Sequence, residues 1–513
     1  MDRIKTEIGG YRKRRGNTSF CLVYPNIYEV GIANLGFQQV YKLLNQIEGV
    51  YCERGFYCEG PFKSFESRRR LSDFSIIGFS FPYELDYMNF FKILKHSKIP
   101  IFSKDRGPHF PAIIAGGVSV SANPTVLAPF VDLFVIGEAE EVLGEIVKVF
   151  INNKKKQSFL KAVSEIEGVY VPELGRGRIE RRWVSDLNRF PTSSCIISPH
   201  SHFKNMYLVE LERGCPYRCR FCMGGYFHNP YRVRDHRKLI EHIKTDRLPK
   251  KSIGLIGAAI SEFPHLEETI RELSPLTNTI HISSLRLDRV SKKLVSLLVK
   301  KGLKQLTIAP ETGGERLRNI IGKNIEDEKI LEVVSYCSSA GAEGIKLYFM
   351  IGLPFETDDD VFKIGELIKE IRRIYNRRIT VSINPFVPKP HTPFQHHNME
   401  GRENLRRKMR LVENSLKVAD PYGGMKGIKV IKKGIREAIL QSIISRGDEK
   451  IGTALGNSIL RGSPVQRIFL EEGIDTDFYT GTREEVTFPW DFIHSKIDRK
   501  GLYTEYRRAK ESI

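Results

Sequence analysis

The sequence ERGCPYRCRFCMGGYFHNPYRVR, residues 212–234, holds three cysteines in the pattern C-x3-C-x2-C. They are Cys215, Cys219 and Cys222. Thiolates gathered this closely serve as metal ligands or redox partners far more often than as packing residues. A structural zinc site normally takes four protein ligands, so three cysteines favour a [4Fe–4S] cluster in which one iron keeps an open position. A zinc site completed by His228 or His202 is the alternative.

Phe221 lies between the second and third cysteine, so the segment also matches C-x3-C-x-aromatic-C. This pattern resembles the signature of the radical S-adenosylmethionine (SAM) superfamily. The resemblance implies that the open iron chelates the amino and carboxylate groups of SAM. It also implies that an electron from the cluster cleaves the sulfonium and releases a 5′-deoxyadenosyl radical. Such an enzyme needs an electron donor such as flavodoxin or ferredoxin.

The composition predicts a cytoplasmic protein of about three domains, because 513 residues suffice for that number. The other five cysteines are scattered, mostly in apolar runs, as expected of reduced thiols and not of disulfides. They are Cys21, Cys52, Cys58, Cys195 and Cys337. The start, MDRIKTEIGG, lacks the apolar core of a signal peptide, and no apolar run approaches the roughly 18 residues of a membrane span. We therefore expect no membrane contact.

The net charge of +20 comes from 81 Lys and Arg against 61 Asp and Glu. Such an excess can attract nucleic acid or another polyanion. The basic residues are spread along the chain, however, and are not interleaved with aromatic residues as in a single-strand binding platform. The net charge is therefore compatible with either an RNA or a small-molecule substrate and does not decide between them.

Residues 1–152 are predicted to form a Rossmann-like domain, because short apolar runs alternate with helical stretches and indicate a parallel sheet covered on both faces. The runs are Phe20–Tyr24, Phe74–Phe81, Ala112–Gly117 and Leu133–Gly137, with a weaker candidate at Val50–Phe56. Helical patterns fill Leu35–Ile47, Tyr87–Lys95 and Glu138–Phe150. Ligands bind at the carboxyl ends of such strands. The candidates at these ends are Gly78, Ser80, Gly116, Gly117, Gly137 and Glu138.

The stretch IIAGGVSVSANPTVLAPFVDLFVIGEAEE, residues 113–141, resembles the cobalamin-binding domain that precedes the barrel in a large class of radical SAM proteins. YPNIYEVGIANLGFQ, residues 24–38, resembles the opening of one family in that class. The resemblance implies that the strand-end residues line a cobalamin face opposite the barrel mouth. Gly117→Leu is then expected to exclude the corrin without unfolding the sheet. The D-x-H-x-x-G motif for an axial histidine is absent, and a domain that has lost its cofactor is the alternative.

Residues 153–200 are predicted to form a connector with a hairpin between Gly168–Pro172 and Arg178–Val184. Residues 201–395 are predicted to form a (β/α)6 partial barrel, whose chemistry sits where strands end. Its strand candidates are Met206–Glu212, Ile253–Ala259, Thr279–Arg286, Gln305–Glu311, Ile345–Leu353 and Ile379–Phe386. Its helical patterns include Ser291–Lys301, Glu326–Ser339 and Asp359–Tyr375.

Arg286 and Glu311 are charges at the ends of apolar strands, where burial without a partner is unfavourable. An ion pair between them would satisfy both. In the preferred interpretation Arg286 binds the SAM carboxylate in a bidentate manner, and Glu311 accepts from the ribose or the amino group.

The resemblance implies three further SAM contacts. Gly257 stands, with Ala258 and Ala259, where the family usually has a Gly-rich edge that receives the amino group, although the common G-G-E pattern is not kept. Ser283 is the first residue of SSLR, residues 283–286, in which the third strand candidate ends. Ile351–Pro354, which contains Gly352 and Leu353, is expected to cover the adenine.

Residues 396–513 are predicted to form a mainly helical domain. NPFVPKPHTPFQ, residues 384–395, is too proline-rich for regular structure and is expected to be a rim loop with Lys389 and His391 solvated. This loop, SRGDEKIG (445–452) and FPWDFIHSKI (488–497) also resemble the cobalamin-plus-radical-SAM family.

The sequence thus predicts an α/β radical SAM enzyme with cobalamin that methylates an unactivated carbon. A cobalamin-associated radical cyclisation or rearrangement is one alternative. A tRNA methylthiotransferase is another, and it would need a second cluster from Cys21, Cys52 and Cys58, whose spacing does not match that family. A cluster-containing binding or redox-sensing protein is the non-enzyme alternative, although it would not need SAM-binding residues.

Overall fold

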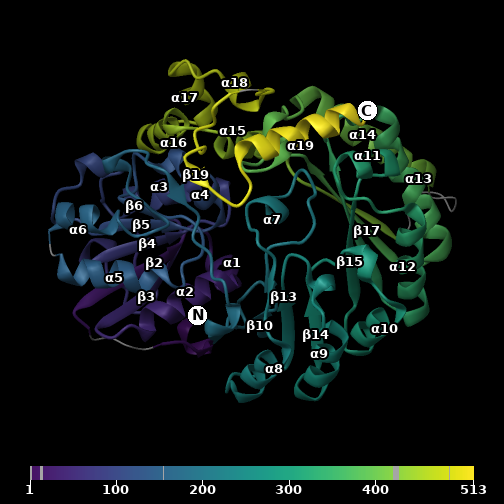
Figure 1. The fold of residues 1–513 in the computed structure, drawn as a ribbon, viewed down its shortest axis with the longest axis horizontal. Helices are drawn as coiled ribbons and strands as arrows, with labels where there is room; N and C mark the ends of the chain where they lie inside the picture. The colour runs from purple at the N-terminus through teal and green to yellow at the C-terminus, as the bar shows by residue number, and fades with distance from the viewer. Residues whose placement is uncertain (1–2, 12–15, 154, 420–426, 485) are drawn as a thin grey trace.

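The computed structural model describes residues 3–11, 16–153, 155–419, 427–484 and 486–513. An N-terminal α/β unit lies beside a central α/β unit, and the last part of the chain lies over both (Figure 1). The α/β class, the N-terminal parallel sheet and the central partial barrel are as predicted. None of the described helices is long and apolar enough to cross a membrane.

The N-terminal unit is a six-stranded sheet of order β3-β2-β4-β5-β6-β7. Its strands are β2 (Thr18–Tyr24), β3 (Val50–Phe56), β4 (Ile76–Ser80), β5 (Ala112–Gly116), β6 (Leu133–Val135) and β7 (Val169–Tyr170). All neighbours pair in parallel except β6 and β7. The predicted strands are all present, including the weaker candidate. Every residue of β2 is buried, because successive side chains enter the cores on opposite faces of the sheet.

Helices cover this sheet on its two faces. They are α1 (Tyr28–Gly31), α2 (Leu35–Gln46), α3 (Tyr87–His96), α4 (Val118–Ala122), α5 (Val142–Asn152) and α6 (Lys156–Val163). The side chain of Asn34 accepts from the N–H of Phe37 and so fixes the start of α2.

The central unit is a partial barrel of seven parallel strands in two sheets, β10-β13-β14 and β15-β16-β17-β18. Its strands are β10 (Met206–Glu210), β13 (Ser252–Ile256), β14 (Thr279–Ile282), β15 (Gln305–Glu311), β16 (Gly344–Ile351), β17 (Arg378–Pro385) and β18 (Ile428–Lys432). A parallel bridge between Leu285 and Ile308 joins the two sheets. The six predicted strands are present, and β18 adds a seventh from beyond the predicted boundary at residue 395.

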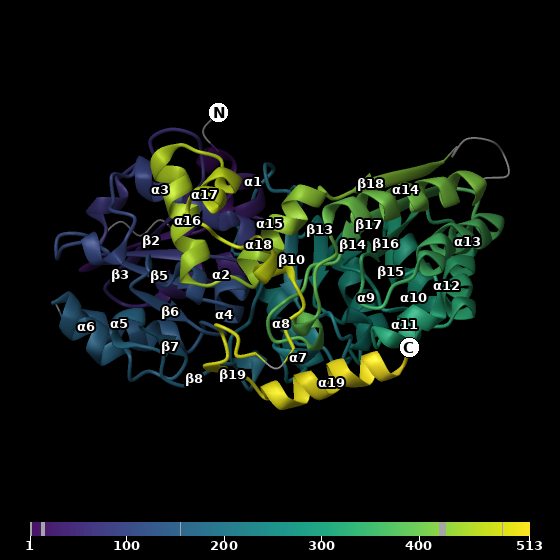
Figure 2. The same ribbon diagram turned by 90° about the horizontal axis from the view of Figure 1, so that it is seen from above.

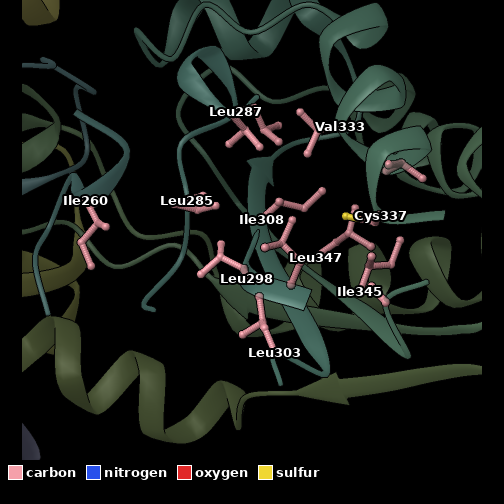
Figure 3. Close-up of a cluster of buried hydrophobic side chains, with 14 of the residues drawn as sticks. Ile260, Leu285, Leu287, Leu298, Leu303, Ile308, Val333, Cys337, Ile345 and Leu347 are labelled. Atoms are coloured by element: carbon pink, nitrogen blue, oxygen red, sulfur yellow. The ribbon is translucent and has the colours of Figure 1, made fainter. Parts of the chain in front are cut away.

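The outer helices of the barrel bury their apolar faces against the strands. They are α8 (His236–Thr245), α9 (Leu266–Leu273), α10 (Lys292–Lys300), α11 (Glu315–Ile320), α12 (Asp327–Ala340) and α13 (Asp358–Ile374). Leu298 of α10, Cys337 of α12 and Leu347 of β16 belong to one buried cluster (Figure 3). Residues of β15 alternate between buried and half-buried positions, so one face packs on the helices and the other faces the barrel interior.

The predicted hairpin in the connector is wrong. Val169–Tyr170 extends the N-terminal sheet through β6, whereas β8 (Ile179–Glu180) pairs in parallel with β19 (Ile493–His494). The partner of β8 lies more than 300 residues along the chain, so a pattern within residues 153–200 could not reveal it.

The segment after residue 396 holds α14 (Arg402–Ala419), α15 (Ile435–Ser445), α16 (Glu449–Arg461), α17 (Val465–Glu471), α18 (Thr476–Thr480) and α19 (Arg499–Glu511). It is mainly helical, as predicted, and spreads over both units (Figure 2). Buried side chains of α14 join the barrel core, and those of α16 and α17 join the N-terminal core. Tyr506 and Ala509 of α19 pack with Leu353 and Phe394 at the barrel mouth. The proposed domain boundary at residue 396 stays a prediction.

Candidate functional site

The three cysteines lie on the loop between β11 (Glu212–Arg213) and the short helix α7 (Met223–Tyr226). This is the carboxyl end of the first barrel strand, where the sequence predicted them. The N–H of Cys222 donates to the carbonyl of Cys219 at 2.9 Å, which folds the loop tightly. Cys219 is buried and the other two are half-buried.

Burial raises the pKa of all three thiols, to about 12 for Cys215. A bound metal would supply the positive charge that stabilises the thiolates. A tetrahedral zinc ion holds its sulfur ligands about 2.3 Å away and hence close together. Among the described residues, the group whose ligand atoms lie within 4.8 Å of one another is His236, Glu268 and Glu272, not the cysteines. The three sulfurs therefore do not meet this 4.8 Å limit, whereas a closed zinc site would hold its sulfur ligands closer together.

Arg286 lies directly beside the cysteine loop. Its Nη1 is 3.6 Å from Cys219 Sγ, and its guanidinium carbon lies 3.6 Å from the centroid of the Tyr217 ring. Its Nε donates to Asp288 at 2.8 Å, and its Nη2 donates to the carbonyl of Lys323 at 2.5 Å. Arg286 therefore lies beside the cysteines, its ion-pair partner is Asp288, and its predicted SAM-binding role stays a prediction.

Glu311 ends β15 at a break in the strand register. Its φ of +72° is in the left-handed region, which a residue with a Cβ adopts only uncommonly. Its carboxylate forms an ion pair with Lys323 at 2.7 Å. Lys323 thus links the two residues, because its carbonyl accepts from Arg286 and its ammonium pairs with Glu311. The sequence did not predict this lysine. The alternative of a direct Arg286–Glu311 ion pair is wrong, since Arg286 pairs with Asp288 and Glu311 pairs with Lys323.

The remaining predicted SAM contacts occupy the same mouth of the barrel. Ser283 Oγ donates to the carbonyl of Gly257 at 3.0 Å. Gly352 has a φ of +73°, and its N–H donates to Glu356 at 2.7 Å. Leu353 is buried in the cluster against which Phe221 packs. These contacts fix the backbone just after β13, β14 and β16, and a SAM-binding role for these residues stays a prediction.

A cavity of about 450 Å³ lies between the carboxyl edge of the N-terminal sheet and the barrel mouth, within the size range of small-molecule sites. All six predicted strand-end residues of the N-terminal sheet line it, together with Gly257 of the barrel. The six are Gly78, Ser80, Gly116, Gly117, Gly137 and Glu138. Gly214 and Gly224, which flank the cysteines, line its opposite wall. The cavity therefore joins the strand-end residues to Gly257 and to the glycines beside the cysteine loop. The cysteines and the other predicted SAM contacts are not among its lining residues, which excludes Cys215, Cys219, Cys222, Phe221, Ser283, Arg286, Glu311, Gly352 and Leu353.

The strand-end glycines differ in whether they can carry a side chain. Gly117 has a φ of +109°, and a Cβ there would lie 2.6 Å from the carbonyl oxygen of Phe81. The expectation that Gly117→Leu leaves the sheet folded is therefore wrong. A Cβ on Gly116 would meet its nearest atom, in Val135, at 3.8 Å, which is ordinary contact. Gly116 is thus the position at which a side chain can be added.

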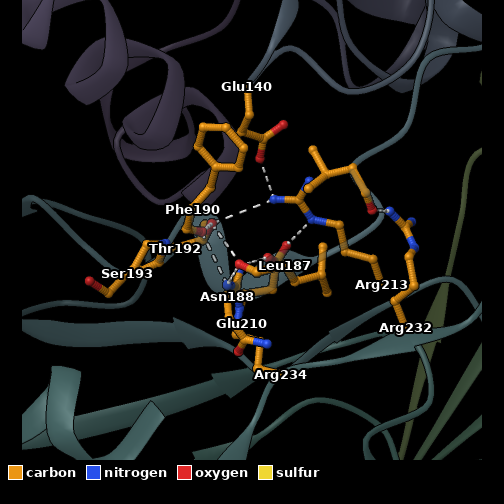
Figure 4. Close-up of polar contacts among 12 residues, drawn as sticks. Glu140, Leu187, Asn188, Phe190, Thr192, Ser193, Glu210, Arg213, Arg232 and Arg234 are labelled. Atoms are coloured by element: carbon orange, nitrogen blue, oxygen red, sulfur yellow. Dashed lines mark hydrogen bonds and ion pairs between the residues drawn. The ribbon is translucent and has the colours of Figure 1, made fainter. Parts of the chain in front are cut away.

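Arginines of the cysteine-loop hairpin hold the two units together. Arg213 pairs with Glu138 at 3.0 Å, with Glu140 at 2.5 Å and with Glu210 at 2.8 Å, and the last two pairs are drawn in Figure 4. Arg232 pairs with Glu138 at 2.7 Å. We call these pairs the arginine clamp.

Glu138 is the centre of this clamp. Burial disfavours its charged form, but the hydrogen bond from Arg232 and the charges of Arg213 and Arg232 outweigh that and lower its pKa to about 2. Its carboxylate is thus occupied by protein partners, so any contact with a cavity ligand would come from its backbone.

Lys389 and His391 are not solvated, which corrects the prediction for the rim loop. Lys389 pairs with Glu84 of the N-terminal unit. His391 is buried, stacks on Phe227 with ring centroids 4.4 Å apart, and places Nε2 3.0 Å from the carbonyl of Ala122. The loop binds to the N-terminal unit because these polar groups find partners there.

Sequence reasoning missed Glu212, Tyr217 and Lys323, of which Glu212 lines the cavity. Glu212 ends an apolar strand directly before the cysteines, which is the same signal that identified Arg286 and Glu311. Tyr217 lies inside the cysteine segment but carries no spacing signal. Lys323 lies 12 residues beyond Glu311, and only the fold brings it back.

Comparison with known proteins identifies the family. "Radical SAM proteins, N-terminal" matches residues 36–172, and "Radical SAM superfamily" matches residues 209–368. The Uncharacterized protein MJ0966 of Methanocaldococcus jannaschii is 30% identical over 446 residues, which cover 85% of this chain and 90% of that protein. The chain belongs to the radical SAM superfamily.

Two other relatives of this radical SAM enzyme are more distant. The anaerobic magnesium-protoporphyrin IX monomethyl ester cyclase of Rubrivivax gelatinosus is 24% identical over 54% of this chain and 52% of its own length. The Uncharacterized methyltransferase PH0819 of Pyrococcus horikoshii is 22% identical over 48% of this chain and 56% of its own length. The chain spans about half the length of each.

The fold of the radical SAM chain is also found in a solved structure. The cobalamin-dependent S-adenosylmethionine radical enzyme OxsB with aqua-cobalamin bound aligns with 96% of this chain and 80% of its own, at a TM-score of 0.53 and 15% identity. The family implies a [4Fe–4S] cluster and SAM. Cys215, Cys219 and Cys222 fit the cluster, since they gather on one loop beside the cations of Arg286 and Lys323. Radical SAM enzymes also need a reductant.

Proposed function

We propose that this radical SAM enzyme binds cobalamin and methylates an unactivated carbon. The observation that carries the proposal is the cavity between the two carboxyl edges, where the six strand-end residues face the cysteine loop. The similarity of fold to a cobalamin-dependent radical SAM enzyme supports it. The methyltransferase relative supports the reaction class.

The cavity lining suits a flat, largely apolar ring with amide side chains at its edge. Phe20, Leu22, Ile114 and Val135 supply apolar surface on the sheet side, and Gly116 leaves the sheet edge open. Cobalamin would supply a transferable methyl group there, and the cluster with SAM would supply hydrogen abstraction. The chain's own part is to hold the two centres against one substrate.

Individual residues have distinct parts in this proposal. Cys215, Cys219 and Cys222 would bind the cluster. Arg286 already donates toward Cys219 Sγ and would pair with the SAM carboxylate. Lys323 would hold the carboxylate of Glu311 until the ribose or amino group of SAM replaces it. The arginine clamp fixes the separation of the two units.

The cyclase relative favours a second candidate, a radical cyclisation or rearrangement without methyl transfer. A methylthiotransferase is less well supported. Cys21 and Cys52 belong to the cores on opposite faces of the N-terminal sheet, and Cys58 is exposed. They do not gather as ligands of a second cluster.

Anaerobically reconstituted enzyme, incubated with deuterated-methyl SAM and a cell extract as substrate source, tests the proposal. Methylation consumes two SAM molecules per turnover, one giving 5′-deoxyadenosine and methionine, the other giving S-adenosylhomocysteine. A labelled product with both nucleosides is expected. Sustained 5′-deoxyadenosine without S-adenosylhomocysteine would favour the cyclisation. Loss of activity after RNase treatment of the extract would identify an RNA substrate, and flavodoxin or ferredoxin is the proposed electron donor.

A further inference from the structure

Glu212 is a buried carboxylate at the cavity wall, three residues before Cys215. Only 2% of its surface is exposed. Its Oε1 accepts from the N–H of Ala259 at 2.8 Å, at the end of the second barrel strand. Its Oε2 is buried and has no hydrogen-bond partner among the described residues. A buried acceptor without a partner is unfavourable by about 1–3 kcal/mol. We therefore expect a donor outside the described residues to bind this oxygen.

The backbone around Glu212 is shaped to hold it in this place. A Cβ on Gly257 would lie 2.1 Å from Glu212 Oε1, so only glycine lets the carboxylate reach the end of β13. Glu212 and Gly257 both line the cavity. The side chain is therefore anchored by one oxygen, while the other is left for a different group.

The other charges on the cavity wall are already neutralised. Glu138, Glu140 and Glu210 pair with Arg213. Arg181 donates to the carbonyl of Asn229 at 2.6 Å and lies 4.0 Å from Glu138. Burial lowers the pKa of His228 to about 4, so it is neutral near pH 7. Although the chain carries a net charge of +20, the cavity presents a free acceptor and not a free cation.

We propose that Glu212 is a ligand-binding residue, whose free oxygen accepts a hydrogen bond from an N–H group of the molecule in the cavity. Two molecules of the proposed function carry such a group, which is an ammonium in SAM and a side-chain amide in cobalamin. The inference thus rests on that function. Above pH 7, where Glu212 is ionised, a phosphate or carboxylate at this point would meet a like charge and is disfavoured.

The alternative is an internal pair with Tyr231, whose hydroxyl is also buried and has no hydrogen-bond partner in the described part of the chain. Burial raises the pKa of Tyr231 most, and the charge of Glu212 raises it further. If Tyr231 donated to Glu212, both groups would be satisfied without any ligand. The test must separate this internal pair from ligand binding.

The test compares the wild type with Glu212→Gln, Tyr231→Phe and the control Glu53→Gln, all reconstituted anaerobically. Glu53 is a buried carboxylate on β3 that accepts from the N–H and hydroxyl of Ser67 and does not line the cavity. Iron content, melting temperature, SAM affinity by calorimetry and hydroxocobalamin affinity by absorbance are measured for each. Glu212→Gln is expected to keep its iron and to bind one of the two ligands about 10-fold more weakly.

The ligand whose affinity falls identifies the source of the N–H donor, and Glu53→Gln should change neither affinity. The proposal is overturned if Glu212→Gln binds both ligands within about twofold of the wild type. It is also overturned if Glu212→Gln and Tyr231→Phe lower the melting temperature by the same amount and leave both ligand affinities unchanged. That result would show that Tyr231 and Glu212 bond to each other and not to a ligand. A wild type that binds no hydroxocobalamin would contradict the proposed function, while the SAM measurement would still decide the role of Glu212.

Discussion

Arg213 Nη1 lies 3.0 Å from Glu138 Oε2, which joins the loop two residues before the first cysteine to the end of strand β6. The same arginine pairs with Glu140 and Glu210 (Figure 4). The cysteine loop and the N-terminal sheet edge are therefore fixed to each other by charge-assisted hydrogen bonds, which are stronger than neutral ones.

Glu138→Gln should lower the free energy of unfolding by about 3 kcal/mol near neutral pH, since it leaves buried arginines with fewer partners. The folded pKa of about 2 is below the ordinary value of 4.5, so this contribution is present above pH 4.5 and is lost as the pH falls toward 2. Denaturant unfolding at several pH values measures the difference.

The exposed carboxylate of Glu145, which pairs with Arg182 at 3.3 Å, provides the control. Glu145→Gln should change stability by less than about 0.5 kcal/mol. If Glu138→Gln and Glu145→Gln lowered the free energy of unfolding by the same amount, the arginine clamp would not be a major source of stability.

Replacing Cys215, Cys219 and Cys222 together with alanine should abolish binding of one oxygen-labile [4Fe–4S] cluster. Cys58→Ala should keep all the iron, because Cys58 is exposed and distant from the loop in sequence. Iron and sulfide analysis of anaerobically prepared protein measures this. Stoichiometric zinc without iron would refute the cluster, and eight irons per chain would indicate a second one.

Arg286→Ala should weaken SAM binding by roughly 1.5–3 kcal/mol, the usual contribution of a charge-assisted hydrogen bond. Arg289→Ala is the matched control, because Arg289 lies on the same segment with an exposed side chain 3.4 Å from Glu262. Calorimetric titration with SAM compares them at equal iron content. Unchanged SAM affinity together with a lower melting temperature would make Arg286 a structural partner of Asp288.

Gly116→Leu should block uptake of hydroxocobalamin while the sheet stays folded, because a Cβ there has ordinary contacts. Gly117→Leu should destabilise the sheet instead, since its backbone is left-handed and Phe81 leaves no room. Circular dichroism and absorbance after reconstitution separate the two effects. Normal uptake by Gly116→Leu would place the corrin elsewhere.

Glu212 should make the stability depend on pH near neutrality. Burial raises its pKa to about 7, against an ordinary 4.5, so the folded state retains a proton that the unfolded state has lost. Stability should therefore fall by roughly 3 kcal/mol as the pH rises from 4.5 to 7, and then level off. Thermal unfolding of the wild type and of Glu212→Gln is measured over this pH range, and the difference between their free energies of unfolding isolates the contribution of Glu212. An identical pH profile for both would show an ordinary pKa.

The strands of both units were predictable because buried parallel strands are nearly continuous apolar runs that end at glycine or a charge. Ala112–Gly116 and Gln305–Glu311 illustrate this. The cysteine loop was predictable because ligand residues must be close together in space, and here they are also close in sequence.

The partners of the site residues were not predictable in the same way. Arg232 and Glu138 are 94 residues apart, and neither has a spacing that points to the other. Lys389 and His391 were expected in solvent because their loop is proline-rich, yet the N-terminal unit covers them. Contacts between units depend on how the two sheets are docked, which local patterns do not encode.

Helix α19 also constrains how the protein can be made. Glu505 of α19 lies 3.5 Å from Arg220, which stands between the second and third cysteine. The two residues are separated by 285 positions. At typical rates of synthesis, the loop leaves the ribosome roughly 15–60 s before the helix that packs over it. Iron can therefore be delivered to a nascent chain whose barrel mouth is still uncovered, and closure by α19 would follow.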